Sequence, residues 1–478
     1  MLVLQDGIMR TRVDSDLPSM TTTHPPHAYR SLLILLLPLW LTQLLQMGHG
    51  MVDTVMAGHV SATAMAAVAV GSGLWLPLLL FIHGVLLANL PLLAEARGAQ
   101  QWIEVTRIVH QGLILAVILS LGALAVMDTI PSLFKYLHIS RDMAPAVTLY
   151  LHGISLGVPA ICMFMVLRAY SESQGYPVPV TLISLTTLML NIPLNTLFIH
   201  GWGPLPAMGG AGCGYATACV YWVSLLMLVL WISWAPSYKQ TRWFSMPITW
   251  NPRLLKRILR LGLPMGASLF FEVSVFALIA VILAPLGSIA VAGHQIALNV
   301  ASLLFMLPLS LSNALTMRTG YYAGSLDVQG LLAMLRAGLK LTLWIAFINA
   351  ALLIGLRHWL PLLYTRDQAV IALARHLMIF SACFQLFDAL QVSAAGVLRG
   401  LKDTRVPLWI SLFAYWGLAM PLGYTLGMTS WLGPARGAPG YWMGLVLGLG
   451  MAAFFLSWRL KQHLSMTLLK LAAIRPIP

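Results

Sequence analysis

The sequence predicts an all-α, polytopic membrane protein with twelve transmembrane helices, and three observations lead to that prediction. Of the 478 residues, 59% are hydrophobic and only 9% are charged, whereas an ordinary globular domain has about 25% charged residues. Apolar stretches of about 20 residues, long enough to cross a hydrocarbon core of about 30 Å, recur along the chain. Loops rich in Lys and Arg alternate along the chain with loops that contain few of them, as expected for a chain that crosses a membrane repeatedly. These observations argue against a soluble enzyme, a nucleic-acid binder and a secreted disulfide scaffold.

The apolar stretches define the expected spans and domains in chain order. The spans cover roughly residues 31–54, 62–89, 107–128, 145–168, 178–200, 211–234, 258–284, 290–315, 333–356, 370–396, 407–428 and 440–458. We expect an N-lobe at 31–234, a cytoplasmic linker at 235–257 and a C-lobe at 258–460. Residues 1–30 lack the apolar core of a signal peptide, so they and residues 461–478 are expected to be cytoplasmic tails. Met20 is an alternative start position.

The distribution of basic residues orients the spans. An even number of spans places both termini on one side of the membrane. If that side is the cytoplasm, 22 of the 28 Lys and Arg lie in the tails and even-numbered loops, and six lie on the opposite face. This asymmetry predicts cytoplasmic termini. The net charge of +14 is then mainly a topology signal, and no nucleic acid or other anionic partner is needed to explain it.

An internal repeat divides the chain into two halves. A shift of about 226 to 231 residues places Pro38 on Pro264 and Arg168 on Arg399, with small gaps absorbed in loops. Six spans preserve orientation, so the two lobes are related by an axis along the membrane normal. We therefore expect a solute site between the lobes, near the midplane of the bilayer.

Three acidic residues lie inside predicted spans. The chain has only 14 Asp and Glu, and those within spans are Asp53 in span 1, Glu272 in span 7 and Asp388 in span 10. An ionised carboxylate at the bilayer centre costs about 2.5 to 3.5 kcal/mol on insertion scales, so it must face a polar interior or take up a proton. The three acids are therefore the candidate ion-coupling and substrate-binding residues. The alternative for any one of them is a neutral acid that holds helices together.

Polar side chains in spans 5 and 6 are candidate partners of Asp53. Asn191 and Asn195 are one helical turn apart, so their amides lie on one face of span 5. Pro193 between them leaves a backbone carbonyl without its helical partner, which a membrane helix tolerates only where another group satisfies it. Thr217 in span 6 is the third candidate partner.

Three other polar positions are weaker candidates. Gln46 corresponds to Glu272 in the repeat, so the N-lobe has an amide where the C-lobe has an acid. His49 lies one turn before Asp53, and His294 is at the start of span 8. A single histidine in a membrane helix is more often a packing or capping residue than a proton carrier.

Several motifs that would indicate other chemistry are missing from the sequence. There is no G-x-x-x-x-G-K-[ST] motif, so ATP does not drive this protein directly. The four cysteines lie in or beside apolar segments without metal-ligand spacing, which favours small packing residues. We therefore expect no cofactor.

Six short motifs, distributed over both lobes, carry a family resemblance. They are MVDTVMAG at 51–58, NIPLN at 191–195, GCGYAT at 212–217, FEV at 271–273, GHQIALN at 293–299 and DALQV at 388–392. Together they resemble multidrug and toxic compound extrusion (MATE) transporters of the bacterial NorM-type branch. The similarity extends from about residue 30 to residue 460 without large insertions.

The resemblance implies two V-shaped lobes with alternating access, in the inner membrane of a bacterium. It implies a monomeric secondary antiporter, not an enzyme, that exports bulky, often cationic drugs in exchange for Na⁺ or H⁺. It assigns ion coupling to Asp53, Glu272 and Asp388, with Na⁺ at the last two, and the polar support of the first lobe to Gln46, Asn191, Asn195 and Thr217. Members that bind sodium often have a tyrosine one turn before the acid of span 10, where this chain has Phe384. The choice between Na⁺ and H⁺ as the coupling ion therefore stays open.

Two other functions stay open as alternatives. A flippase for lipid-linked precursors, in the same superfamily, would need a cavity rich in Arg or Lys to bind pyrophosphate, and the predicted spans contain few such residues. An intramembrane enzyme would need a catalytic motif, and neither H-E-x-x-H nor G-x-S-x-G occurs.

Overall fold

The chain is described by a computed structural model, which covers residues 25–134, 140, 142–204, 206–241, 246–431 and 433–474. Its regular structure over these ranges is helical, with no strand. Eleven helices are long and apolar enough to cross a membrane, and one bent pair of shorter helices raises the number to twelve. This confirms the predicted all-α fold with twelve spans.

The N-lobe contains the first six spans. They are α2 (Pro25–Val60), α3 (Ala62–Leu86) continued by α4 (Asn89–Gly98), α5 (Trp102–Thr129), the bent pair α6 (Ala144–Ser155) and α7 (Val158–Ser173), α8 (Val178–His200) and α9 (Gly212–Trp234). The bend of 43° between α6 and α7 precedes Pro159, whose ring is incompatible with an uninterrupted helix. Short 3-10 segments are η1 (Ile130–Leu133), η2 (Gly209–Ala211) and η3 (Pro236–Thr241).

The C-lobe contains the other six spans. They are α10 (Pro252–Leu283), α11 (Ser288–Gly324), α12 (Val328–Leu356), α13 (Gln368–Gly400), a composite span made of α14 (Arg405–Leu412), η6 (Phe413–Ala419) and α15 (Met420–Met428), and α16 (Ala438–Ile474). The 3-10 segments are η4 (Ala284–Leu286) and η5 (Leu360–Leu363). The segment η6 is a π-helix that ends at Ala419, two residues before Pro421. Proline lacks the N–H of a regular turn and clashes with the carbonyl four residues earlier, so the helix widens before it.

Three helix ends extend into segments for which the sequence predicts tails or a linker. Helix α2 begins at Pro25, α10 begins at Pro252, and α16 continues to Ile474. Hydropathy marks only the part of a helix that lies in hydrocarbon, and a helix continues into water where charged side chains replace apolar ones. Residues 1–24, 242–245 and 475–478 of the predicted tails and linker lie outside the described residues.

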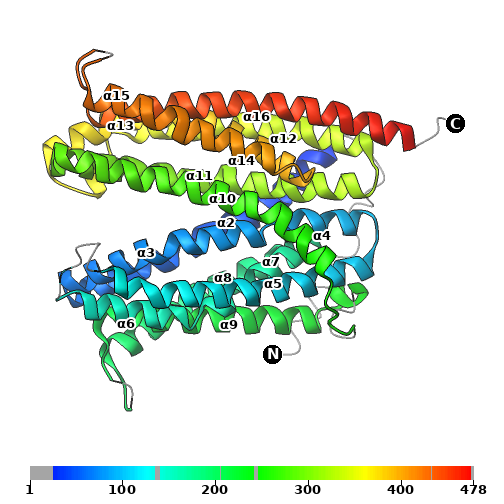
Figure 1. Ribbon diagram of the computed structural model, residues 1–478, viewed down its shortest axis with the longest axis horizontal. Coiled ribbons are helices and arrows are strands. Elements are labelled where there is room, and N and C mark those ends of the chain that lie inside the picture. Colours follow the sequence, from blue (N-terminus) through cyan, green and yellow to red (C-terminus); the bar gives the residue numbers. More distant parts are fainter. Residues whose placement is uncertain are drawn as a thin grey trace.

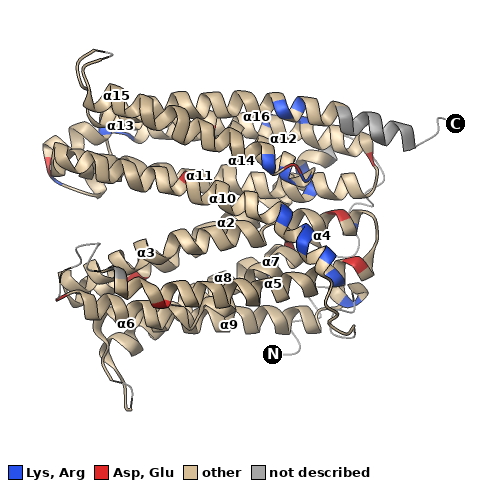
Figure 2. Ribbon diagram, in the orientation of Figure 1, with Lys and Arg blue, Asp and Glu red and all other residues tan. Residues whose placement is uncertain are grey.

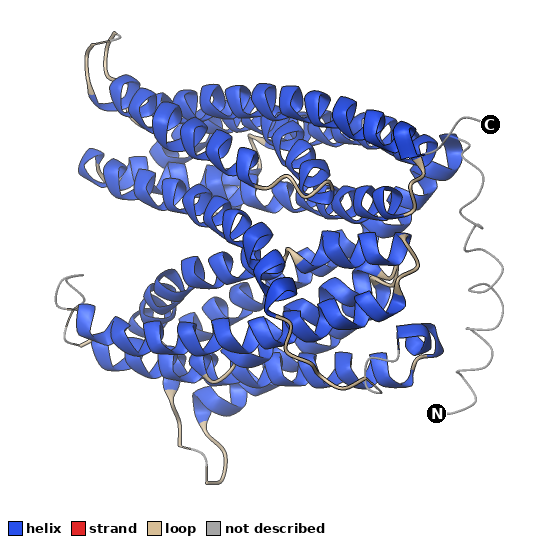
Figure 3. Ribbon diagram, turned by 45° about the vertical axis from the view of Figure 1, so that its right-hand side comes forward, coloured by secondary structure: helices blue, strands red, loops and turns tan. Residues whose placement is uncertain are grey.

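The two lobes meet at one end of the molecule and diverge toward the other. In Figure 1 the C-lobe lies above the N-lobe, and α3 and α10 separate toward the left, as they also do in the rotated view of Figure 3. Basic residues gather at the right, where α2 begins and α16 ends (Figure 2). We call this the basic end, and Arg97, Arg257, Lys402 and Arg459 mark it.

Glycines bring the backbones of the two lobes into direct contact near the basic end. Helix α3 packs on α10, and α4 packs on α11. A Cβ atom built on Gly84 would lie 2.5 Å from the Cα of Gly266, and one built on Gly324 would lie 2.0 Å from the backbone oxygen of Glu95. Real Cβ contacts are not this short, so side chains at these positions would push the lobes apart.

Replacing Gly324 with valine is expected to destabilise the protein by about 1 to 3 kcal/mol, because the added atoms overpack the contact with Glu95. The matched control is Gly355→Val, since a Cβ on Gly355 meets nothing within 4 Å. Both glycines lie near the C-terminal end of a long helix, so the effect of the change from glycine to valine on helix propensity is similar at the two positions. The midpoint of thermal unfolding in detergent measures the difference. Equal midpoints for the two variants would contradict the tight contact.

An acidic side chain anchors the end of α16 to the turn after α13. Nε of Arg459 donates to Oδ2 of Asp403 at 2.8 Å, and Nδ1 of His463 lies 3.3 Å from the same oxygen. Partial burial raises the pKa of the Asp403 carboxyl, but hydrogen bonds from His463 and Arg459 and their charges outweigh burial, so its pKa lies below the ordinary value.

This anchor is expected to depend on pH. The pKa of Asp403 is lower in the folded protein, so its stabilisation is present above the unfolded pKa of about 3.9 and is lost as pH falls through the folded value. Asp403→Asn is therefore expected to lower the unfolding midpoint at pH 7, and the difference from the unmodified protein is expected to shrink below about pH 4. A difference that stays constant with pH would show that the carboxylate charge is not involved.

Candidate ion and substrate site

Asp53 lies at the centre of a hydrogen-bonded group in the N-lobe. Its side chain on α2 is 4% exposed, between α8 and α9. Oδ1 accepts hydrogen bonds from the Nδ2 atoms of Asn195 at 2.7 Å and Asn191 at 3.2 Å, and Oδ2 accepts one from the Thr217 hydroxyl at 2.7 Å. The structure thus brings the three predicted polar partners together around this acid.

The asparagine pair connects Asp53 to the shape of α8. Pro193 lies inside this helix, and Asn195 also donates to Oδ1 of Asn191 at 3.1 Å. Oδ1 of Asn195, its single side-chain oxygen, is buried without a hydrogen-bond partner. Three donors facing one carboxyl group suit an ionised carboxylate. A proton on Oδ2 of Asp53 is accommodated when the Thr217 hydroxyl rotates and accepts a hydrogen bond in place of donating one.

Gln46, expected among the polar support of the N-lobe, lies outside the hydrogen-bonded group of Asp53 and contacts Arg168 of the same lobe. Its Oε1 accepts from Nη1 of Arg168 at 2.7 Å, while Gln43 accepts from Nη2 at 2.8 Å. Gln46 is seven residues from Asp53 on α2, which corresponds to about 10 Å along a helix. The repeat gives equivalent positions in the two lobes, but it does not place Gln46 within reach of Asp53.

Arg168 and Glu172 form a buried ion pair. Nε of Arg168 lies 2.6 Å from Oε1 of Glu172, and the two side chains are 8% and 4% exposed. Glu172→Gln is expected to destabilise the protein by about 2 kcal/mol, because a neutral acceptor replaces a charged one beside a buried cation. The control is Glu104→Gln, whose more exposed pair with Arg107 spans 3.8 Å and contributes less than about 1 kcal/mol. Thermal unfolding in detergent measures both, and equal losses would refute the distinction.

A second acidic group lies in the C-lobe. The hydroxyl of Tyr415, in η6, donates to Oε1 of Glu272 on α10 at 3.2 Å. Asp388 on α13 is 2% exposed, and Phe384, one turn before it, packs edge-on against Phe276, one turn after Glu272, with ring centroids 6.1 Å apart. Oδ1 of Asp388 is buried without a hydrogen-bond partner. The two acids that the sequence predicts as a pair therefore belong to one site, and that site has an unused acceptor.

Tyr415 of this C-lobe site does not appear among the sequence candidates, although its hydroxyl contacts Glu272. Nη2 of Arg399 donates to the Ser312 hydroxyl at 2.6 Å. Pro421 in span 11 was a usable signal for Tyr415, because prolines in membrane helices accompany the irregular turns found at functional sites.

The remaining candidates have mainly packing contacts. Phe384 contacts Phe276 and Trp442 edge-on, with ring centroids 6.1 and 5.9 Å apart. His294 is fully buried, and its Nδ1 accepts from the Trp442 indole at 3.2 Å. His49 is partly buried, and its Nδ1 has no hydrogen-bond partner. Phe384 therefore contributes a ring and no oxygen near Asp388.

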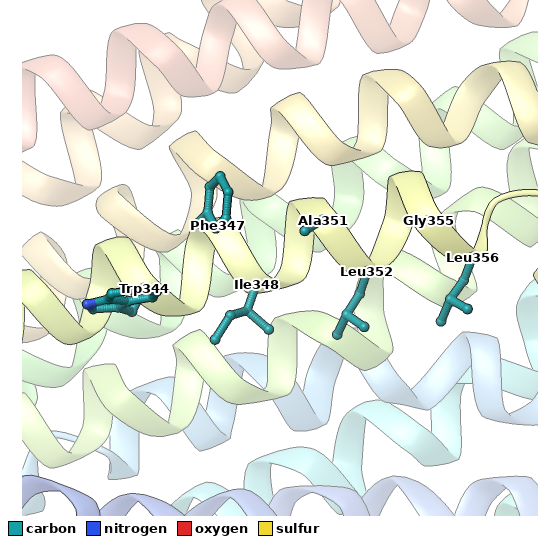
Figure 4. Close-up of a pocket in the computed structure, with 7 residues that line it drawn as sticks. All are labelled: Trp344, Phe347, Ile348, Ala351, Leu352, Gly355 and Leu356. Atoms are coloured by element: carbon teal, nitrogen blue, oxygen red, sulfur yellow. The ribbon is translucent and has the colours of Figure 1, made fainter.

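The acid sites differ from the hollow on the outside of α12. That hollow is lined by Trp344, Phe347, Ile348, Ala351, Leu352, Gly355 and Leu356 (Figure 4). Its lining carries no ionisable group, so it suits an acyl chain better than an ion. Within the described ranges, no three His, Cys, Asp or Glu side chains gather as a metal cluster. The acid groups thus suit a proton, a monovalent ion or an organic cation.

Comparison with known proteins identifies the family. The MatE family model matches twice, at residues 38–197 in the N-lobe and 264–425 in the C-lobe. The chain belongs to the MatE family. This MatE protein is 44% identical to the probable multidrug resistance protein NorM of Acinetobacter baylyi (strain ATCC 33305 / BD413 / ADP1), over 91% of this chain and 96% of that one. It is 41% identical to the multidrug resistance protein NorM of Vibrio cholerae serotype O1, over 91% and 96% of the two chains.

Solved structures show the same fold. The eukaryotic MATE transporter AtDTX14 superposes with a TM-score of 0.82 at 16% identity, over 94% of this MatE chain and 99% of that one. A MATE structure in the bent conformation superposes with a TM-score of 0.83 at 19% identity, over 94% and 100% of the two chains. The curated relatives are named for multidrug resistance, so the flippase alternative is not favoured.

Proposed function

We propose that this MatE protein is a secondary antiporter that exports bulky, often cationic drugs in exchange for a coupling ion. The observation that carries the proposal is that Glu272 and Asp388 lie at the same level of the C-lobe, because Phe276, one turn after Glu272, packs on Phe384, one turn before Asp388. Asp388 is buried, and one of its carboxylate oxygens lacks a hydrogen-bond partner. Membrane proteins keep such costly groups where ions or polar substrates pass. The names of relatives at 41% and 44% identity support drugs as the substrates.

Exchange follows from the charges of the C-lobe site. Two neighbouring carboxylates repel each other strongly in a low-dielectric surrounding. Either an organic cation or a coupling ion relieves this repulsion, so the two compete for Glu272 and Asp388. Entry of the ion neutralises the charge that holds the drug, and the drug leaves on the side from which the ion came.

The donor sets favour H⁺ over Na⁺ as the coupling ion. At Asp53 both oxygens already face N–H or O–H groups, whose hydrogens point at the carboxylate and would repel a metal ion. Near Asp388, the side chain of Phe384 offers no oxygen ligand. A proton needs only one carboxylate oxygen, and the unpartnered Oδ1 of Asp388 provides it.

We place the protein in the inner membrane of a bacterium, with the basic end in the cytoplasm, in accord with the positive-inside rule. In that orientation the lobes are closed toward the cytoplasm and diverge toward the outside, which is the arrangement from which a drug is released (Figure 2). The acid groups each lie within one lobe of a single chain, which supports function as a monomer.

Ion replacement in proteoliposomes tests the proposal. Purified protein is reconstituted with ethidium, and either a pH gradient without Na⁺ or a Na⁺ gradient without a pH difference is imposed. We expect the pH gradient to drive ethidium transport above the level of protein-free liposomes. Transport driven by the Na⁺ gradient alone would overturn the assignment of H⁺. Transport that ignores both gradients would overturn antiport itself.

A further inference from the structure

One acidic side chain joins the two lobes at the basic end. Oε2 of Glu95, on α4 of the N-lobe, lies 3.3 Å from Nη2 of Arg257 on α10 of the C-lobe. Oε1 of the same carboxylate pairs with Nζ of Lys402, in the turn after α13 of the C-lobe. Within the described part of the chain, these are the two ion pairs that cross between lobes. A single carboxylate therefore bridges two cations of the opposite lobe.

The surroundings of Glu95 make this bridge sensitive to the distance between the lobes. Its backbone oxygen faces Gly324 of α11, where no Cβ would fit. Two residues further along α4, the guanidinium of Arg97 lies 5.6 Å from the centroid of the Tyr321 ring on α11. The Glu95 side chain is 27% exposed, so water screens its charge only in part.

Lys402 is held by the conformation of its turn. Its φ of 64° lies in the left-handed region, which residues other than glycine adopt rarely. The amide of Lys402 also donates to the backbone oxygen of Arg399, so the turn is tied to the end of α13. The backbone that carries Lys402 is thus fixed to the C-lobe, and its ammonium can follow Glu95 only within the reach of a lysine side chain. An opening of the basic end beyond that reach breaks the ion pair.

We propose that Glu95 is a positioning residue of the transport cycle, whose two ion pairs hold the basic end closed. Glu95 belongs to neither acid group described above, so its charge acts on the balance between lobe arrangements and not on drug or ion binding. This inference goes beyond the proposed function and requires only that the lobes move relative to each other.

Distance measurements between the lobes test this role directly. Spin labels are attached at Thr63→Cys, at the start of α3, and Ser288→Cys, at the start of α11, which are exposed and lie at the end opposite Glu95. The background carries Cys219→Ser and Cys383→Ser, because Cys162 and Cys213 are buried and should not react. Double electron–electron resonance in nanodiscs then reports how far apart the lobes are.

We expect the unmodified chain to give mainly the long separation seen where the lobes diverge. In Glu95→Gln, the ratio of short to long separations is expected to rise by about three- to tenfold, the range expected for losing two partly exposed ion pairs. The control Glu104→Gln removes an acid whose ion pair lies within the N-lobe, and it is expected to leave the distances unchanged.

Two further variants separate charge from packing. Glu95→Lys is expected to shift the distances more than Glu95→Gln, and adding Lys402→Glu should move them back toward the unmodified distribution. If Glu95→Gln does not fold, the double variant Arg257→Gln with Lys402→Gln removes the same pairs from the other lobe. Unchanged distances in the charge-loss variants would overturn the proposal. Failed drug transport with unchanged distances in the unmodified protein would instead count against the proposed function alone.

Discussion

Asp388→Asn is expected to lower ion-driven drug efflux by at least about tenfold, which corresponds to about 1.4 kcal/mol or more. The substitution keeps the size of the side chain but removes one of the two carboxyl groups of the C-lobe site. Asparagine can neither take up the coupling proton nor attract a cation. Ethidium uptake into inverted vesicles, or its transport in proteoliposomes, under a pH gradient measures the loss, with protein amount matched by immunoblot.

Two further variants are measured in the same experiment. Glu272→Gln removes the other charge of the pair and is expected to give a similar loss. Glu104→Gln removes a partly exposed charge on α5 and is expected to retain efflux, which controls for expression and net charge. Full efflux in both Asp388→Asn and Glu272→Gln would exclude the C-lobe pair from coupling.

Asp53→Asn is expected to lower efflux by about tenfold or more while leaving the fold intact. The fold tolerates the amide because its new N–H group can donate to Oδ1 of Asn195, which is buried and unpartnered in the native group. Efflux is expected to fall because asparagine carries no negative charge for the three donors to stabilise. It also lacks a carboxyl group that could take up and release a proton. Efflux and the unfolding midpoint are measured on the same preparations.

A neighbouring substitution controls for disturbance of α2. Thr54 is partly buried, and its hydroxyl donates only to the backbone of Gly50 at 2.8 Å among the contacts described here. Thr54→Val is expected to retain efflux and stability. If Asp53→Asn unfolds at a much lower temperature than Thr54→Val, the carboxylate is holding helices together and its loss of efflux has a structural cause.

The sequence was sufficient for the spans because crossing a membrane imposes a length and a hydropathy that few other structures need. It was insufficient for the helix ends at Pro25 and Ile474, since no such constraint acts in water. The Asp53 group was predictable for a similar reason. Asn191 and Asn195 are one turn apart, and local periodicity shows that they share a face.

The C-lobe site was only partly predictable, because it depends on distances between helices. Tyr415 reaches Glu272 from η6, 143 positions away in the chain, and no periodicity links the two.

The glycine contacts between the lobes have a mechanical consequence. Side chains of packed helices normally interlock, and pulling such helices apart requires many rotamers to change together. Where Gly84 meets Gly266, backbone touches backbone, although the side chain of Val85 also lies against Gly266. Fewer rotamers need to change when the lobes part at this contact than at one made by large side chains on both helices. The energy needed to part the lobes there is correspondingly small, so the two ion pairs of Glu95 contribute a larger share of the balance between closed and open arrangements.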